Sequence, residues 1–135
     1  MLQPVVIDGI RTPIGKLNGA MKDIQPEEIA AFLLQKICER SHLDIRLLDA
    51  VILGQAKQSS DQPNIARLAA LMTKFPLEVQ AYTVHRQCGS GMQAVQNAAQ
   101  EIMCGYADFV LAGGIESMSN AQYYLREARR GYAVG

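Results

Sequence analysis

The sequence lacks an apolar run long enough to cross a membrane, and it lacks an excess of either charge. Its 135 residues include 13 Lys and Arg and 13 Asp and Glu, so the formal net charge is zero. A balanced charge gives no reason to expect a nucleic acid or an anionic membrane as partner. The N-terminus also lacks the basic region and cleavage site of a signal peptide. We therefore expect a cytoplasmic protein that binds neither membrane nor nucleic acid.

Cysteine and histidine are scarce. The chain has three cysteines, Cys38, Cys88 and Cys104, and two histidines, His42 and His85. An odd number of widely spaced cysteines argues against a disulfide framework, and so few ligands argue against a zinc site. We expect no bound metal and a reducing compartment. Cys38 and Cys104 come late in predicted helices, where we interpret them as inert, buried or half-buried thiols.

Apolar strand-like runs alternate with helical patterns along the whole chain, without repeats or linkers. The hydrophobic fraction of 49% and the charged fraction of 19% are typical of one globular domain with a core. This alternation predicts an α/β fold with crossover connections and a mainly parallel sheet. The predicted strands are 5–7, 50–54, 79–85 and 109–112. Three helices are predicted: the first begins at Gln25–Pro26, the second spans 61–72 and the third spans 89–103.

Each of the first two predicted helices has one apolar face. Proline at the first helical position and the early acidic residues Glu27 and Glu28 favour a helix start at Pro26. The spacing of apolar residues predicts which side chains face the core. These are Ile29, Phe32, Leu33 and Ile37 in the first helix, and Ile65, Leu68, Ala69 and Met72 in the second.

The helix predicted over 89–103 has little charge, Glu101 being its one charged residue. Ala94 and Ala98 make a second side that is small rather than polar. Such a helix is typical of a position between two layers, where small side chains permit close approach. Gly105 is a predicted C-terminal stop. The apolar stripe consists of Met92, Val95, Ala99, Ile102 and Met103.

Cys88 lies where the strand 79–85 gives way to this helix. The first N–H groups of a helix have no internal partner, and the positive end of the dipole lies there. Both effects favour the thiolate, which is the nucleophilic form. Gly89 and Gly91 leave room for a substrate carbonyl and leave backbone N–H groups open to an oxyanion. This pattern indicates acyl transfer; the alternative is a small residue that simply fits a glycine-rich turn.

Four segments, in order, resemble the thiolases, the acetyl-CoA C-acyltransferases. The run 83–95, with His85-Arg86-Gln87-Cys88-Gly89-Ser90-Gly91 at its centre, resembles that family's nucleophile segment. The run 112–119 resembles its glycine-rich segment, and 11–15 its N-terminal signature, while Ile52-Leu53-Gly54 and Ala66-Arg67 fall at the expected intervals. The related ketoacyl synthases also place a cysteine before a buried helix, but 11–15 and 112–119 resemble thiolases more.

The resemblance implies the thiolase fold, in which layers of sheet and helix repeat in two similar halves, with residues 1–135 as an incomplete first half. Cys88 would accept the acyl group as a thioester, and its own backbone N–H would bind the oxyanion. The substrate would be a coenzyme A thioester, with no permanently bound cofactor. The residues implied to shape the pocket are Gly89, Gly91, Gly113, Gly114 and Met118, and at Gly113 and Gly114 any side chain would collide. Glu116, Met118 and Ser119 would form the loop behind the site, or simply a structural loop.

Two features depart from the family pattern. Thiolases usually carry Asn where this chain has His85, three residues before the nucleophile. Three residues along an extended segment place side chains on opposite faces, so His85 need not touch Cys88. It is either a general base or a histidine bonded in a core or subunit contact. The second departure is that residues 1–135 do not include the family's second half, which carries its His base, its second Cys and its water-holding Asn. The other histidine, His42, is predicted at a helix end and has no relation in sequence to Cys88.

We therefore expect the N-terminal portion of a thiolase of fatty acid metabolism, transferring an acyl group between coenzyme A and an acyl-CoA. It would form or cleave a 3-oxoacyl-CoA through a Cys88 thioester, but turnover needs a base that this chain lacks. The alternative is a truncated, non-catalytic domain that acts as a dimerising or scaffold remnant. Expected partners are acyl-CoA, a separately encoded second half, and a further copy paired through the strand 79–85. The basic cluster of Arg126, Arg129 and Arg130 is a solvated face, or else contacts an acidic cofactor or partner.

Overall fold

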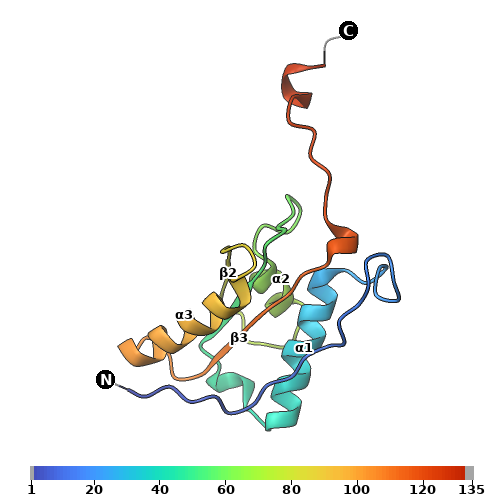
Figure 1. Cartoon of the computed structure of the whole chain (residues 1–135). Helices are drawn as coiled ribbons and strands as arrows, with labels where there is room; N and C mark the ends of the chain where they lie inside the picture. Colours follow the sequence, from blue (N-terminus) through green and yellow to red (C-terminus); the bar gives the residue numbers. More distant parts are fainter. Residues whose placement is uncertain (1, 133–135) are drawn as a thin grey trace.

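A three-stranded parallel sheet forms the centre of the computed structural model, which describes residues 2–132. The strands are β1 (Ala50–Gly54), β2 (Gln80–Val84) and β3 (Val110–Gly114), in the order β2-β1-β3. The central strand β1 pairs in parallel with both neighbours (Figure 1). The carboxyl ends of all three strands therefore lie at one edge of the sheet. The predicted α/β fold with a parallel sheet is confirmed.

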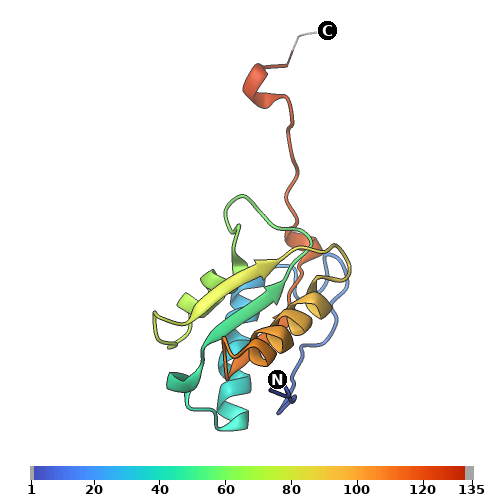
Figure 2. The same ribbon diagram turned by 90° about the vertical axis from the view of Figure 1, so that its left-hand side faces the viewer.

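Helices cover both faces of the sheet. Helices α1 (Pro26–Ser41) and α2 (Ile65–Leu71) lie on one face, and α3 (Ser90–Cys104) lies on the other (Figure 2). Successive residues of a strand point to opposite faces. Val51 and Leu53 accordingly pack in the cluster with α1 and α2, and Ile52 packs with Ala94 and Ala98 of α3. The whole of β1 is buried, which explains its continuous apolar run.

Helix α1 begins at Pro26 as predicted, and Ile29 is buried as predicted, but the buried face as a whole is shifted from the predicted one. Phe32 is exposed, and Lys36 Nζ lies 5.9 Å from the centre of its ring. Leu34 and Cys38 are buried instead. The helix carries apolar residues on adjacent faces, so periodicity by itself could not show which face meets the sheet.

Helix α2 begins at Ile65, later than the predicted residue 61. Asn64 is its N-cap, because its side-chain oxygen accepts a hydrogen bond from Arg67 N at 3.1 Å. The Asn64 amide also donates to the carbonyl of Ala81 at 3.0 Å, which ties the helix start to β2. The small residues Ala66 and Ala70 are buried where Leu68 and Met72 were predicted.

The strand predicted over residues 5–7 is absent. These residues are extended but pair with no strand, and Val5, Val6 and Ile7 are exposed. Arg40 holds the following residues instead, through hydrogen bonds to the Asp8 carboxylate and to Gly9 O. The Arg40 guanidinium keeps the pKa of Asp8 below its ordinary value. An apolar run predicts a strand only if a neighbour offers backbone partners, and within residues 2–132 the edge strand β3 pairs with β1 alone.

Helix α3 approaches the sheet most closely at its N-terminal end. A Cβ at Gly54 would lie 2.2 Å from the carbonyl carbon of Ser90 and 2.4 Å from Gly91 N. A Cβ at Gly114 would lie 3.1 Å from Gly91 Cα. Glycine is required at Gly54 because no side chain could occupy that space. The backbone of α3 thus rests directly on the ends of β1 and β3.

Helix α3 was predicted to be buried on two sides, but in the described structure only the side that faces the sheet is buried. Ser90, Ala94 and Ala98 face the sheet and are buried. Met92 and Val95, from the predicted apolar stripe, are exposed because no described segment covers that side.

Replacing Gly54 with alanine should lower the free energy of unfolding by about 3 kcal/mol or more, because the methyl group meets backbone atoms that cannot turn aside. The measurement is urea unfolding followed by circular dichroism. Gly113→Ala is the matched control in the neighbouring strand, where a Cβ would meet only Leu53 Cδ2, at 3.9 Å. The control should change stability by less than about 1 kcal/mol. Equal effects of the two substitutions would contradict the close contact.

Candidate functional site

Cys88 lies in a tight turn between β2 and α3, at the carboxyl edge of the sheet. Gly89 N donates to Arg86 O at 3.0 Å, and Ser90 N donates to Gln87 O at 3.1 Å. Gln87 has a φ of +49°, which is the left-handed region that L side chains rarely adopt. The turn leaves Cys88 exposed at the surface.

Several backbone N–H groups beside Cys88 are open. Helix α3 has Gly89 as its N-cap and no side-chain cap, and its first internal bond runs from Gln93 N to Gly89 O at 2.9 Å. Among residues 2–132, the N–H groups of Cys88, Gly91 and Met92 have no acceptor. Free N–H groups at a helix N-terminus favour a negative charge, such as an oxyanion.

The hydroxyl group of Ser90 holds the same turn. Ser90 Oγ accepts from Arg86 N at 2.8 Å and donates to Gln87 O at 2.6 Å. The side chain of Arg86 in turn donates to Gln93 Oε1, on the first turns of α3. Sequence reasoning overlooked Ser90; the available signal was a polar residue at the first position of a helix expected to be buried. Ser90 is buried, with 4% of its surface exposed.

The glycines named from the sequence differ in how closely other atoms approach them. The close approach expected at Gly114 is found, with Gly91 Cα at 3.1 Å and Gly54 O at 3.3 Å from a Cβ placed there. The collision expected at Gly113 is not found, because its nearest neighbour is the flexible Leu53 side chain at 3.9 Å. A Cβ at Gly89 would lie 3.4 Å from Arg86 O. Their role in shaping a substrate pocket stays a prediction.

The loop after β3 is held by polar contacts to distant segments. The Glu116 carboxylate accepts from Ala56 N at 2.8 Å and from Lys57 N at 3.1 Å, so it fixes the loop that follows β1. Ser119 Oγ accepts from Asn18 N at 2.9 Å. Met118 is exposed. The geometry favours the structural alternative for Glu116 and Ser119.

Neither histidine makes a hydrogen bond to Cys88 within residues 2–132, and a role of His85 as a general base stays a prediction. The side chain of His85 is exposed and makes no hydrogen bond within the described part of the chain, so it is not the core-bonded histidine considered from the sequence. His42 caps the C-terminus of α1, with a φ of +53°. It precedes the start of β1 and therefore lies toward the amino edge of the sheet, away from Cys88.

The other two cysteines lie in different surroundings. Cys38 is buried as predicted, and burial, with a smaller effect of the Glu39 charge, raises the pKa of its thiol. Cys104 is exposed, so its predicted burial is wrong. It lies at the end of α3 outside the sheet contact. The arginines at 126, 129 and 130 lie on the exposed C-terminal segment that extends away from the domain (Figure 1).

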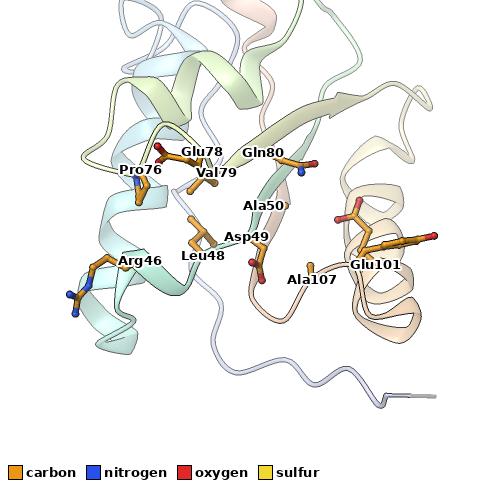
Figure 3. A pocket seen from close by; sticks show the side chains of 11 residues that line it. Arg46, Leu48, Asp49, Ala50, Pro76, Glu78, Val79, Gln80, Glu101 and Ala107 are labelled. Atoms are coloured by element: carbon orange, nitrogen blue, oxygen red, sulfur yellow. The ribbon is translucent and has the colours of Figure 1, made fainter.

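A hollow lies at the opposite edge of the sheet from Cys88. Its volume is about 600 Å³, and its walls come from the amino ends of the strands (Figure 3). Two of its carboxylates have partners: Asp49 accepts from Asp108 N at 2.7 Å, and Glu101 accepts from Tyr82 OH at 2.8 Å. Burial, followed by this bond, raises the pKa of Tyr82. No group of three metal-ligating side chains forms among residues 2–132, in this hollow or elsewhere.

Comparison with known proteins agrees with the geometry. A family model described as "Thiolase, N-terminal domain" matches residues 4–135. The chain is 39% identical to a 3-oxoadipyl-CoA/3-oxo-5,6-dehydrosuberyl-CoA thiolase of Escherichia coli (strain K12), over 98% of this chain and 34% of that protein. It is also 39% identical to a probable acetyl-CoA acyltransferase of Staphylococcus epidermidis (strain ATCC 12228 / FDA PCI 1200), over 100% and 34%.

The fold is likewise that of a solved relative. The crystal structure of the Bacillus anthracis acetyl-CoA acetyltransferase superposes with a TM-score of 0.88 and 43% identity, over 92% of this chain and 32% of that one. The chain thus spans about a third of the length of the relatives it matches. In the part of the chain that the structure describes, no helix is long and apolar enough to cross a membrane.

The left-handed conformation of Gln87, immediately before Cys88, predicts that substitutions at this position differ in their effect on stability. Gln87→Val should lower the free energy of unfolding by roughly 1–2 kcal/mol, because a β-branched side chain is strained at this φ. Gln87→Gly should change it by less than about 1 kcal/mol, since glycine adopts positive φ without strain. Urea unfolding of both variants checks this, and equal stability of the two would show that the turn does not require the left-handed conformation.

Proposed function

The chain belongs to the thiolase family as its N-terminal domain, and on that premise we propose that it carries the acyl-accepting nucleophile of an acyltransferase. The reaction would move an acyl group between coenzyme A and an acyl-CoA, with formation or cleavage of a 3-oxoacyl-CoA. The observation that carries the proposal is the exposed Cys88 beside free N–H groups at the start of α3. We place this activity in fatty acid metabolism in the cytoplasm, with the coenzyme A thioester as substrate and no bound cofactor.

In the first half-reaction, the Cys88 thiolate attacks the carbonyl carbon of the acyl-CoA thioester. A bond forms between Sγ and that carbon, and the carbonyl oxygen becomes an oxyanion. The N–H group of Cys88 is placed to stabilise this charge, since it has no other acceptor within residues 2–132. When the oxyanion collapses, the bond to the coenzyme A sulfur breaks and coenzyme A leaves as a thiolate that requires a proton.

That proton, and the base for the second half-reaction, must come from outside this chain. His42 lies at the C-terminus of α1, away from Cys88. His85 is exposed and makes no hydrogen bond within residues 2–132. The relatives are about three times as long. We therefore propose that a second half, continuous with this chain or encoded separately, completes the site. The lack of a proton donor beside Cys88 also favours the competing possibility of a non-catalytic remnant.

Acyl transfer to Cys88 separates these possibilities. The chain incubated with acetyl-CoA should gain one acetyl group on the peptide that contains Cys88, detected by mass spectrometry, with little condensation product. Cys88→Ser should abolish the label, while Cys104→Ser, which removes another exposed thiol, should keep it. Supplying the second half of a relative should start turnover, because it restores the proton partners. The enzyme proposal fails if Cys88 stays unlabelled even with that half present.

We also propose that the chain pairs with a second copy through the outer edge of β2. The strand order places β2 at an edge. On its outer side the Ala81 carbonyl already accepts from the Asn64 amide, but the outward N–H groups have no acceptor among residues 2–132. Gln80 N donates to Asp49 O at 3.0 Å, toward β1, so the alternating N–H groups of Ala81 and Thr83 point outward. The exposed apolar side of α3 further favours association.

Sedimentation velocity should accordingly show a dimer or larger species. Ala81→Pro, which removes one outward N–H group from an edge strand, should shift the distribution toward monomer. Ala81→Val, which keeps that N–H group, is the matched control and should sediment like the parent chain. A parent chain that remains monomeric at high concentration would contradict pairing.

A further inference from the structure

We propose that Ser90 is the positioning residue of the nucleophile: its hydroxyl group holds the turn that aims Cys88. That this turn matters for acyl transfer rests on the proposed function. That the Ser90 hydroxyl group holds the turn does not depend on it. Ser90 Oγ accepts from Arg86 N at 2.8 Å and donates to Gln87 O at 2.6 Å. One side chain thereby bonds the two residues that immediately precede Cys88.

The turn needs such a restraint because one of its residues adopts an unfavourable conformation. Gln87, at a φ of +49°, would relax toward negative φ if nothing held its carbonyl in place. That carbonyl accepts both Ser90 N, at 3.1 Å, and Ser90 Oγ. Without the hydroxyl group, the N–H group of Arg86 would also lose its partner, so two restraints on the turn would disappear together.

Ser90 can hold the turn because it is itself held. It is buried, and its backbone lies against Gly54 so closely that a Cβ there would come within 2.2 Å. The hydroxyl group thus connects an exposed turn to the close backbone contact between α3 and the sheet at Gly54. No contact between Ser90 and the Cys88 sulfur is involved, so Ser90 acts through the backbone and is not a catalytic residue.

Two kinds of reagent distinguish the correct orientation of the Cys88 sulfur from its mere accessibility to solvent. An electrophile with a carbonyl group needs the Cys88 sulfur and the nearby free N–H groups in the correct relation, because an oxyanion forms. An alkyl halide needs only the sulfur. Loosening the turn should therefore slow acylation of Cys88 more than its alkylation, while thiols elsewhere are unaffected.

The experiment measures both rates on the same chain. p-Nitrophenyl acetate acetylates the thiolate, forming an S–C bond as the C–O bond breaks and p-nitrophenolate leaves. Iodoacetamide alkylates it, forming an S–C bond as iodide leaves. Mass spectrometry of the separated peptides gives both rates for Cys88, and the exposed Cys104 is the internal reference. Neither reagent contains coenzyme A, so the outcome is independent of the labelling by acetyl-CoA described above.

Ser90→Ala should lower the ratio of acylation to alkylation at Cys88 by roughly fivefold or more, as expected for lost hydrogen bonds that orient reacting groups. The double variant Ser90→Ala, Gln87→Gly should recover much of the ratio, because glycine has no tendency to leave positive φ. Ser41→Ala removes a similar hydroxyl-to-carbonyl bond, 2.7 Å long, at the end of α1, and should leave the ratio unchanged. A Ser90→Ala ratio close to that of the parent overturns the proposal.

A second pair of variants tests the proposal if Ser90→Ala does not fold. Ser90→Thr and Ser90→Val have the same shape and differ in the hydroxyl group alone. If the hydroxyl group positions the turn, the threonine variant keeps a higher ratio than the valine variant. Equal ratios for the two would overturn the proposal as well.

Discussion

The close contact between α3 and the ends of two strands is the constraint on which the site depends. Gly54 admits the backbone of Ser90 at a distance that no side chain would allow. The approach at Gly114 is less extreme, since a Cβ there would lie 3.1 Å from Gly91 Cα. The helix can therefore begin directly against the carboxyl edge of the sheet. The chain must pass from β2 into that helix within a few residues, and this forces the tight turn in which Cys88 is exposed.

The turn exposes Cys88 and leaves neighbouring N–H groups free, while no side chain among residues 2–132 forms a hydrogen bond with its sulfur. This division fits a chain that spans about a third of its relatives' length. The packing of α3 is also one-sided, since the small side of the helix is buried while Met92 and Val95 are exposed. Under the proposed function, the described residues would bind the oxyanion, and residues outside them would move the protons.

Sequence reasoning succeeded where local pattern and backbone pairing agree. The central strand, the helix after Cys88 and the glycine-rich strand β3 were found with small errors at their ends. It failed where the outcome depends on a neighbour. Residues 5–7 have a strand-like composition but no pairing strand among residues 2–132. Phe32, which was predicted to face the core, is exposed, and so is Cys104 at the end of α3.

The sequence by itself determined the alternation of strands and helices and the place of Cys88 between a strand and a helix, because both depend on residues adjacent along the chain. It also carried the motifs that identify the family. Only the tertiary structure decided why Gly54 must be glycine, that Glu116 anchors the loop after β1, and that Ser90 bonds the turn before Cys88. The first two depend on atoms brought together from distant segments. The third depends on backbone angles that residue type does not reveal.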